Sequence, residues 1–86
     1  MNINNLIAIV KKKITSEIAI ERIEVEDKSF LHKKHSGYQV GKYHLKLIIR
    51  SKELKKLNKI DSNKIIYKVL NYEMKEYIHS LQILIS

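Results

Sequence analysis

The 86-residue chain contains no cysteine, no proline and no tryptophan, and it has only two glycines. Without cysteine the chain forms no disulfide, no thiolate zinc site and no cysteine nucleophile, so apolar packing must supply its stability. No apolar run approaches the roughly 20 residues that a membrane-spanning helix needs. In residues 1–13 the lysines follow the apolar stretch, which is the reverse of a secretory signal. We therefore expect a soluble, cytoplasmic protein with one small domain over residues 1–86 and no membrane partner.

Lysine and arginine outnumber the carboxylates by 17 to 9, which gives a formal net charge of +8 at pH 7. A basic balance favours anionic partners such as nucleic acid or an acidic protein surface. Isoleucine, lysine and asparagine are all abundant, as A/T-rich codon usage would produce. The charge alone therefore leaves two alternatives open, a functional patch and a solvated lysine-rich surface.

Hydrophobic periodicity predicts the elements of the N-terminal half. Apolar residues that recur at three- and four-residue steps predict a first helix, with Asn2 or Asn4 as its N-cap. Alternation of apolar and polar residues then predicts a half-buried strand over 22–26, and a second strand over 43–50. Residues 28–42 show no sustained period and are interpreted as a long loop. The apolar face of the first helix consists of Ile3, Leu6, Ile7, Val10 and Ile14.

The C-terminal half is predicted to contain two helices and a last strand over 78–85. Ser51 can cap a short helical turn that runs through Leu57, and Asp61 or Ser62 can cap a longer helix. This order defines an α+β fold, α-β-β-α-α-β, with a three-stranded sheet covered on one face by helices. The inner face of the longer helix is predicted to carry Ile65, Ile66, Val69, Leu70 and Tyr77.

The four histidines are the candidate metal ligands, because imidazole commonly binds zinc, iron and copper. His32 and His35 lie in the long loop, His44 opens the second strand and His79 opens the last one. Ordinary roles remain open for three of them: a solvated loop position for His32, a surface or hydrogen-bonding position for His44, and a partly buried position for His79. From spacing, the candidate pair of ligands is His35 and His79. Because the chain has no cysteine, an iron–sulfur cluster here would need sulfur ligands from a partner at a shared site.

A second candidate site is a cationic edge on the two predicted helices of the C-terminal half. Consecutive helices with such an edge are typical of helix-turn-helix proteins, which present one helix to the major groove of DNA. The alternative is that these lysines only keep a small domain soluble. The candidate nucleic-acid-binding residues are Lys52, Lys55, Lys56, Lys64 and Lys68.

The remaining chemistry does not indicate an enzyme. The chain has no P-loop, and Gly37 and Gly41 do not form a dinucleotide-binding fingerprint. Glu24 and Glu26 are two residues apart on a strand, and this alternation favours a solvated face over a catalytic pair. Glu73 falls within the apolar stripe of the longer helix, where it could pair with a lysine or lie near His79.

From Val25 onward the chain resembles the BolA-like family. His35 stands nine residues ahead of His44, as the loop histidine of the family does, and the tail is similar to the family's V-H-A-L signature. The matching pieces, in order, are Asp27-Lys28-Ser29, His32, His35, Gly37, Gly41, His44, Ser51, Ile65-Ile66-Tyr67 and Ile78-His79-Ser80-Leu81.

The resemblance implies a fold related to class II KH domains and a non-enzymatic partnership with monothiol glutaredoxins. In such complexes the two proteins share a [2Fe–2S] cluster, to which the glutaredoxin cysteine and glutathione supply sulfur. The matching ligands in this chain are His35 and His79, with His32 as a substitute if the loop takes another register. The implied role is iron homeostasis or cluster trafficking. The isolated chain is expected to bind no cluster and to be a monomer or weak homodimer.

The resemblance also implies an alternative, because bacterial members of the family are described as DNA-binding transcriptional regulators of stress responses and cell shape. The family often carries R-H-R at the start of the long helix. The equivalent stretch here is Ser62-Asn63-Lys64, which keeps only the positive charge of Lys64. A third hypothesis is a purely structural interaction domain in which the histidines only pack.

Overall fold

The fold combines a three-stranded sheet with four helices, as a computed structural model of residues 1–29 and 42–86 shows. This arrangement confirms the predicted α+β class and the predicted order of elements, except that two helices stand where one longer helix was predicted. No helix in these two ranges is both long enough and apolar enough to cross a membrane. The elements are α1 (Ile3–Glu17), β1 (Arg22–Asp27), β2 (Tyr43–Arg50), α2 (Lys52–Lys55), α3 (Lys59–Val69), α4 (Asn71–Glu76) and β3 (Ile78–Ile85).

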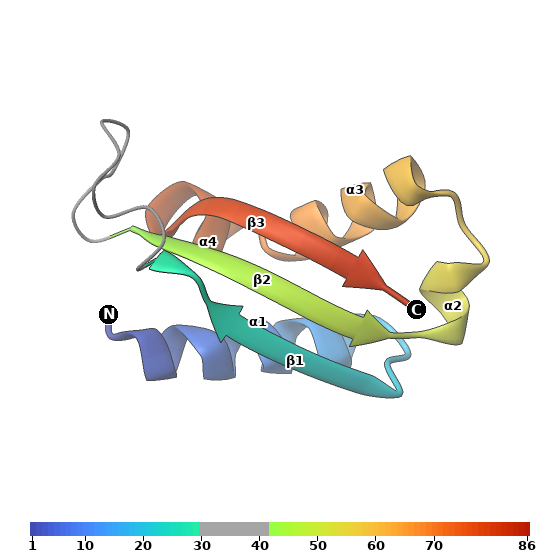
Figure 1. The fold of residues 1–86 in the computed structure, drawn as a ribbon, viewed down its shortest axis with the longest axis horizontal. Helices are drawn as coiled ribbons and strands as arrows, with labels where there is room; N and C mark the ends of the chain where they lie inside the picture. Colours follow the sequence, from blue (N-terminus) through green and yellow to red (C-terminus); the bar gives the residue numbers. More distant parts are fainter. Residues whose placement is uncertain (30–41) are drawn as a thin grey trace.

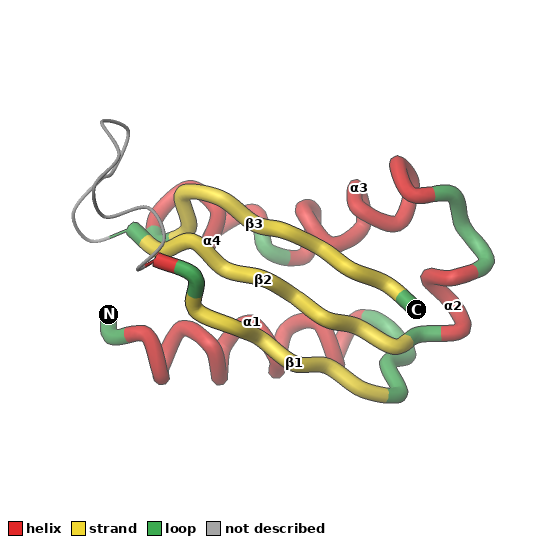
Figure 2. Tube along the Cα trace, in the orientation of Figure 1, coloured by secondary structure: helices red, strands yellow, loops and turns green. Residues whose placement is uncertain are grey.

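The sheet is mixed, with β2 at its centre. β1 pairs with β2 in antiparallel register, and β3 pairs with β2 in parallel register. A parallel pair needs a crossover connection, and α2, α3 and α4 supply it. In Figure 1 the helices α1, α3 and α4 lie behind the strands, so they cover one face of the sheet, while α2 sits at the end where β2 and β3 finish. Figure 2 shows the three strands side by side in front of these helices.

The hydrophobic core lies between the sheet and the helices that cover it. On α1 the fully buried residues are spaced four apart, as one face of a helix requires. On β2 the buried apolar residues are spaced two apart, because alternate strand residues face the helices. Both predicted faces are confirmed. The core residues are Leu6, Val10, Ile14, Leu45, Leu47, Ile49, Leu54, Ile66, Leu70, Ile78 and Ile83.

Two of the predicted caps are confirmed by hydrogen bonds. Asn2 caps α1, since its side chain accepts a hydrogen bond from the Asn5 N–H at 2.8 Å. Ser51 caps α2 in the same way, with its hydroxyl accepting from the Leu54 N–H at 3.2 Å. The helix after Ser51 ends at Lys55, two residues before the predicted Leu57.

The predicted start of the longer helix is wrong. α3 begins at Lys59 and is capped by Asn58, whose side chain accepts from the Asp61 N–H at 2.8 Å. Asp61 and Ser62 therefore lie inside the first turn of the helix. The buried Ser62 hydroxyl donates to the Lys59 carbonyl instead of capping.

The predicted single long helix is also interrupted. α3 ends at Val69, and the chain resumes as α4 after Leu70, so Tyr77 follows α4 rather than lying on one continuous face. Ile66 is fully buried while its neighbour Ile65 is 36% exposed. Consecutive helical residues differ by about 100° in direction, so only one of the two can face the core.

Candidate functional site

A β-bulge in β3 determines where His79 points. Tyr43 of β2 lies opposite Ile78, but the next residue of β2, His44, lies opposite Ser80. His79 is therefore the extra residue of the bulge, and regular pairing resumes beyond it. A regular strand would have placed His79 on the same face as Leu81. The bulge exposes its side chain instead, so the expectation of a partly buried His79 is wrong.

His44 is buried beside His79, with only 5% of its surface exposed. Its Nδ1 lies 2.6 Å from the Ser80 hydroxyl oxygen. Its backbone N–H donates to the Ser29 hydroxyl at 3.1 Å, and its carbonyl accepts from the Lys28 N–H at 2.7 Å. The expected hydrogen-bonding role is confirmed. The expected surface position is wrong, because the residues after β1 fold against this end of β2.

The side-chain rings of His44 and His79 are in contact. The centroids of the His44 and His79 rings are 4.9 Å apart, and their planes are inclined by 58°. The buried ring of His44 therefore forms one wall beside the exposed ring of His79. This contact positions an accessible imidazole at the start of β3.

The predicted partner of His79 in metal binding lies outside the described residues. His35, its substitute His32, and the loop glycines all fall within 30–41. Their flanking residues are held at the same end of the sheet as His79. Lys28 bonds to His44, and the Tyr43 N–H donates to the Tyr77 carbonyl at 2.9 Å. The pairing of His35 with His79 therefore stays a prediction.

The donor set around His79 fits a shared cluster rather than a complete metal site. Within residues 1–29 and 42–86, no group of three histidine, cysteine or carboxylate side chains could hold a metal ion. His79 offers one accessible nitrogen donor, and the cysteine-free chain offers no thiolate. Such a residue can complete a cluster whose sulfur ligands come from elsewhere.

The sequence allowed two positions for Glu73, paired with a lysine or near His79. In the structure it pairs with a lysine. Its Oε2 lies 2.6 Å from Nζ of Lys13, and its side chain is only 4% exposed. The pair joins α4 to α1. Glu73 therefore has a structural position, and nothing in its contacts places it in the histidine site.

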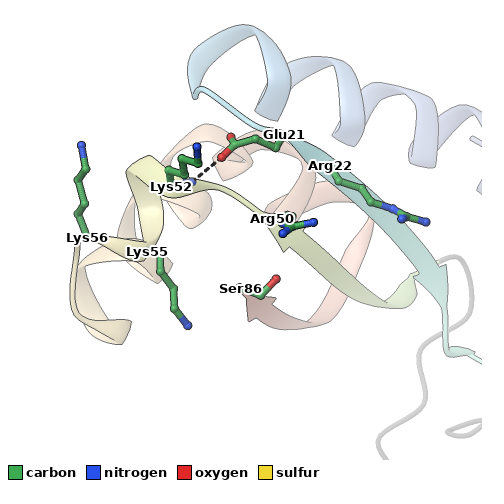
Figure 3. A pocket seen from close by; sticks show the side chains of 7 residues that line it. All are labelled: Glu21, Arg22, Arg50, Lys52, Lys55, Lys56 and Ser86. Atoms are coloured by element: carbon green, nitrogen blue, oxygen red, sulfur yellow. Dashed lines mark hydrogen bonds between the residues drawn. The ribbon is translucent and has the colours of Figure 1, made fainter.

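A second site is a hollow at the end of the sheet where β2 and β3 finish, which we call the basic hollow (Figure 3). Its side chains come from residues in or next to the start of β1, the end of β2, the short helix α2 and the end of β3. Arg22 and Arg50 were not among the sequence candidates. They are adjacent because the antiparallel register places one opposite the other. The arginines at the ends of the two predicted strands were the sequence feature that could have indicated this pair. The lining residues are Glu21, Arg22, Arg50, Lys52, Lys55, Lys56 and Ser86.

The structure divides the five candidate lysines into two groups. Lys52, Lys55 and Lys56 line the basic hollow, whereas Lys64 and Lys68 are exposed on α3. Lys68 lines a different hollow, together with Lys13, Ser16, Glu17, Ile18, Ile65 and Val69. Lys68 and the three lysines of the basic hollow therefore line different hollows, while Lys55 also borders a third hollow beside Lys59 and Asn63 of α3.

Much of the charge in the basic hollow is not neutralised by nearby carboxylates. Arg22 pairs with Glu24 at 2.6 Å, and Lys56 lies 3.6 Å from Glu53. Both are contacts between exposed side chains, which contribute little. Among the ion pairs of the described residues, none includes the side chains of Arg50, Lys52 or Lys55.

Comparison with known proteins identifies the class. The model of the BolA-like protein family matches residues 14–86, and the chain belongs to this family. A relative from Haemophilus influenzae, described as "DNA-binding transcriptional regulator BolA", is 32% identical over 73 residues, covering 85% of this chain and 68% of the relative. The family resemblance expected from the sequence is thus confirmed.

Solved structures give the same result for the fold. The BolA domain of SufE1 from Arabidopsis thaliana superposes with a TM-score of 0.82 and 26% identity, covering 99% of this chain and 94% of that domain. BolA1 from the same plant gives a TM-score of 0.76 at 23% identity, covering 93% and 88% of the two chains. The second likeness bears on the fold alone.

Proposed function

We propose that this BolA-like protein is a non-enzymatic partner of a monothiol glutaredoxin and shares a [2Fe–2S] cluster with it in iron homeostasis or cluster trafficking. The observation that supports this proposal is the position of His79, exposed at a β-bulge and flanked by the buried ring of His44. The partner cysteine and glutathione would supply sulfur. His79 and His35, or His32 in its place, would supply nitrogen.

The residues of this chain would act by positioning a nitrogen donor. The Ser80 hydroxyl holds the ring of His44 at Nδ1, and this ring limits the directions that His79 can take. A ligand held in this way loses less conformational freedom when it binds. When bound, the cluster supplies transferable iron and sulfide, or a redox centre.

The test is anaerobic co-purification with a monothiol glutaredoxin, followed by visible absorption and circular dichroism. We expect a coloured heterodimer whose spectrum changes or disappears with His79→Ala. Gln82→Ala, at an exposed position of the same strand, should leave the spectrum unchanged. Far-UV circular dichroism verifies that each variant is folded.

Three outcomes would contradict parts of the proposal. An unaltered spectrum in folded His79→Ala removes His79 from the site. His35→Ala and His32→Ala assign the second ligand by the same readout. A colourless mixture without a complex refutes the glutaredoxin partnership, and a complex that persists in the histidine variants without metal favours a purely structural interaction domain.

A second candidate function is DNA binding in transcriptional regulation. Two observations favour it: the Haemophilus relative is described as a DNA-binding transcriptional regulator, and Lys52, Lys55 and Lys56 gather beside two arginines. Each phosphate contact on duplex DNA contributes about −0.9 to the slope of log K against log salt. Binding to duplex DNA with a steep salt slope supports this function, and binding that ignores the lysine-to-glutamine variants refutes it.

A further inference from the structure

The basic hollow is built on a hydrogen-bonded junction of three strand ends. The Ser51 N–H donates to the Ser86 carbonyl at 3.1 Å, and the Glu21 N–H donates to the Arg50 carbonyl at 2.9 Å. The Lys52 N–H donates to Oε1 of Glu21 at 2.9 Å. These bonds fix the backbone that carries the cations, so only their side chains need ordering when an anion binds.

The chemistry of the hollow suits phosphate groups. Five cationic side chains and one acidic side chain line an open volume of about 690 Å³. That carboxylate, on Glu21, is engaged by a backbone N–H and points to Lys52 rather than standing alone in the hollow (Figure 3). A guanidinium can bind two oxygens of one phosphate, while lysine ammonium groups act as point charges toward neighbouring phosphates.

The lysines on α3 have different surroundings from the cations of the basic hollow. Lys68 shares its hollow with Glu17 and three apolar residues, and Lys13 at the same place is already paired with Glu73. Lys64 and Lys68 are exposed and four residues apart on one helix, as solvated lysines commonly are. Lys64 and Lys68 are therefore not among the residues that line the basic hollow, and the hollow beside Lys68 has two cationic side chains against five in the basic hollow.

We propose that the basic hollow is the phosphate-contact site for duplex DNA, with Arg50 and Lys55 as contact residues and with Lys64 and Lys68 outside it. This inference rests on the second candidate function. Arg50 lies at the end of β2 and Lys55 in α2, so one backbone strand of DNA would cross the junction between these two elements. Arg22, Lys52 and Lys56 add to the positive potential around it.

Two variants with the same loss of charge test the location. Arg50→Gln/Lys55→Gln removes two cationic side chains from the basic hollow, and Lys64→Gln/Lys68→Gln removes two cationic side chains from α3. Binding to a short mixed-sequence duplex is measured by fluorescence anisotropy over a series of salt concentrations. We expect the first variant to bind more weakly, with a slope of log K against log salt reduced by about 1.8, which corresponds to two phosphate contacts. The α3 variant should keep the wild-type slope.

The outcomes distinguish failure of the location from failure of the function. If wild-type protein binds duplex DNA and the α3 variant loses as much slope as the hollow variant, the location is wrong and DNA binding stands. If wild-type protein does not bind duplex DNA even at low salt, both are overturned. All four side chains are exposed, so the folds should persist. Arg50→Lys, which keeps the charge, should retain the slope and controls for local disruption.

Discussion

At the scale of single residues, the pair formed by Lys13 and Glu73 is the most consequential polar contact in the described part of the chain. Glu73 is 3% exposed, and no other carboxylate of residues 1–29 and 42–86 is buried. Its partner Nζ lies 2.6 Å away and also stands 5.8 Å from the centre of the Tyr72 ring. A buried carboxylate that loses its donor keeps the cost of desolvation without compensation.

We therefore expect Lys13→Met to lower the free energy of unfolding by about 1–3 kcal/mol, the usual cost of a buried polar group left unsatisfied. Chemical denaturation followed by circular dichroism measures it. Lys12→Met is the matched control, because Lys12 is the neighbouring residue of α1 and is exposed. Equal losses in the two variants would show that the ion pair contributes nothing.

A second prediction at this scale concerns the hydrogen bond between His44 and Ser80. Ser80→Ala removes the hydroxyl that lies 2.6 Å from Nδ1 of a buried imidazole. We expect a loss of about 1 kcal/mol in the free energy of unfolding and a changed ¹⁵N shift of the His44 ring nitrogens. Gln82→Ala, two residues further along β3, should leave both unchanged. An unaltered ring shift in Ser80→Ala would mean that this bond does not set the state of His44.

At the scale of elements, α3 depends on a cap that the sequence did not reveal. Asn58 accepts from the Asp61 N–H, whereas Leu70 at the start of α4 makes no side-chain capping bond. Asn58→Ala should therefore destabilise the protein by about 1 kcal/mol. Asn71→Ala, the first residue of α4, is the matched control and should be neutral. Similar unfolding midpoints for the two variants would contradict the cap.

The elements that the sequence predicted are those whose periodicity is local. The four-residue spacing of α1 and the alternation of β2 can be read without knowing what packs against them. Asn58 was missed because Asp61 and Ser62 are equally good caps by residue type. The break at Leu70 was missed because neither glycine nor proline marks it.

The candidate sites depend on contacts between distant strands, and here the sequence was a poorer guide. Counting parity along β3 placed His79 on the face of Leu81. The bulge, visible only in the pairing of Tyr43 with Ile78 and of His44 with Ser80, removes it from that face. Arg22 and Arg50 are 28 positions apart in the chain and meet through the register of β1 and β2. Family resemblance singled out His79 as a candidate ligand, while its exposure required the structure.

At the scale of the whole molecule, the two proposed surfaces lie at opposite ends of one strand. His79 follows the first residue of β3, and Ser86 of the basic hollow follows its last residue, Ile85 (Figure 1). A strand rises about 3.3 Å per residue, so the two surfaces are separated by roughly 23 Å along β3. A partner bound at the histidine end therefore need not cover the basic hollow.

This separation predicts that the glutaredoxin complex still binds DNA. Adding a monothiol glutaredoxin to the chain bound to labelled duplex should raise the anisotropy further, because a ternary complex tumbles more slowly than the binary one. The dissociation constant for DNA should change less than about threefold, since sites without a shared two-state element are weakly coupled. His79→Ala should abolish the second rise and keep the first. Arg50→Gln/Lys55→Gln should weaken DNA binding, so both rises on the labelled duplex become smaller, while gel filtration without DNA should still show its complex with glutaredoxin. A fall of anisotropy on adding glutaredoxin would mean that the two partners compete for one surface, and that one of the two sites has been placed wrongly.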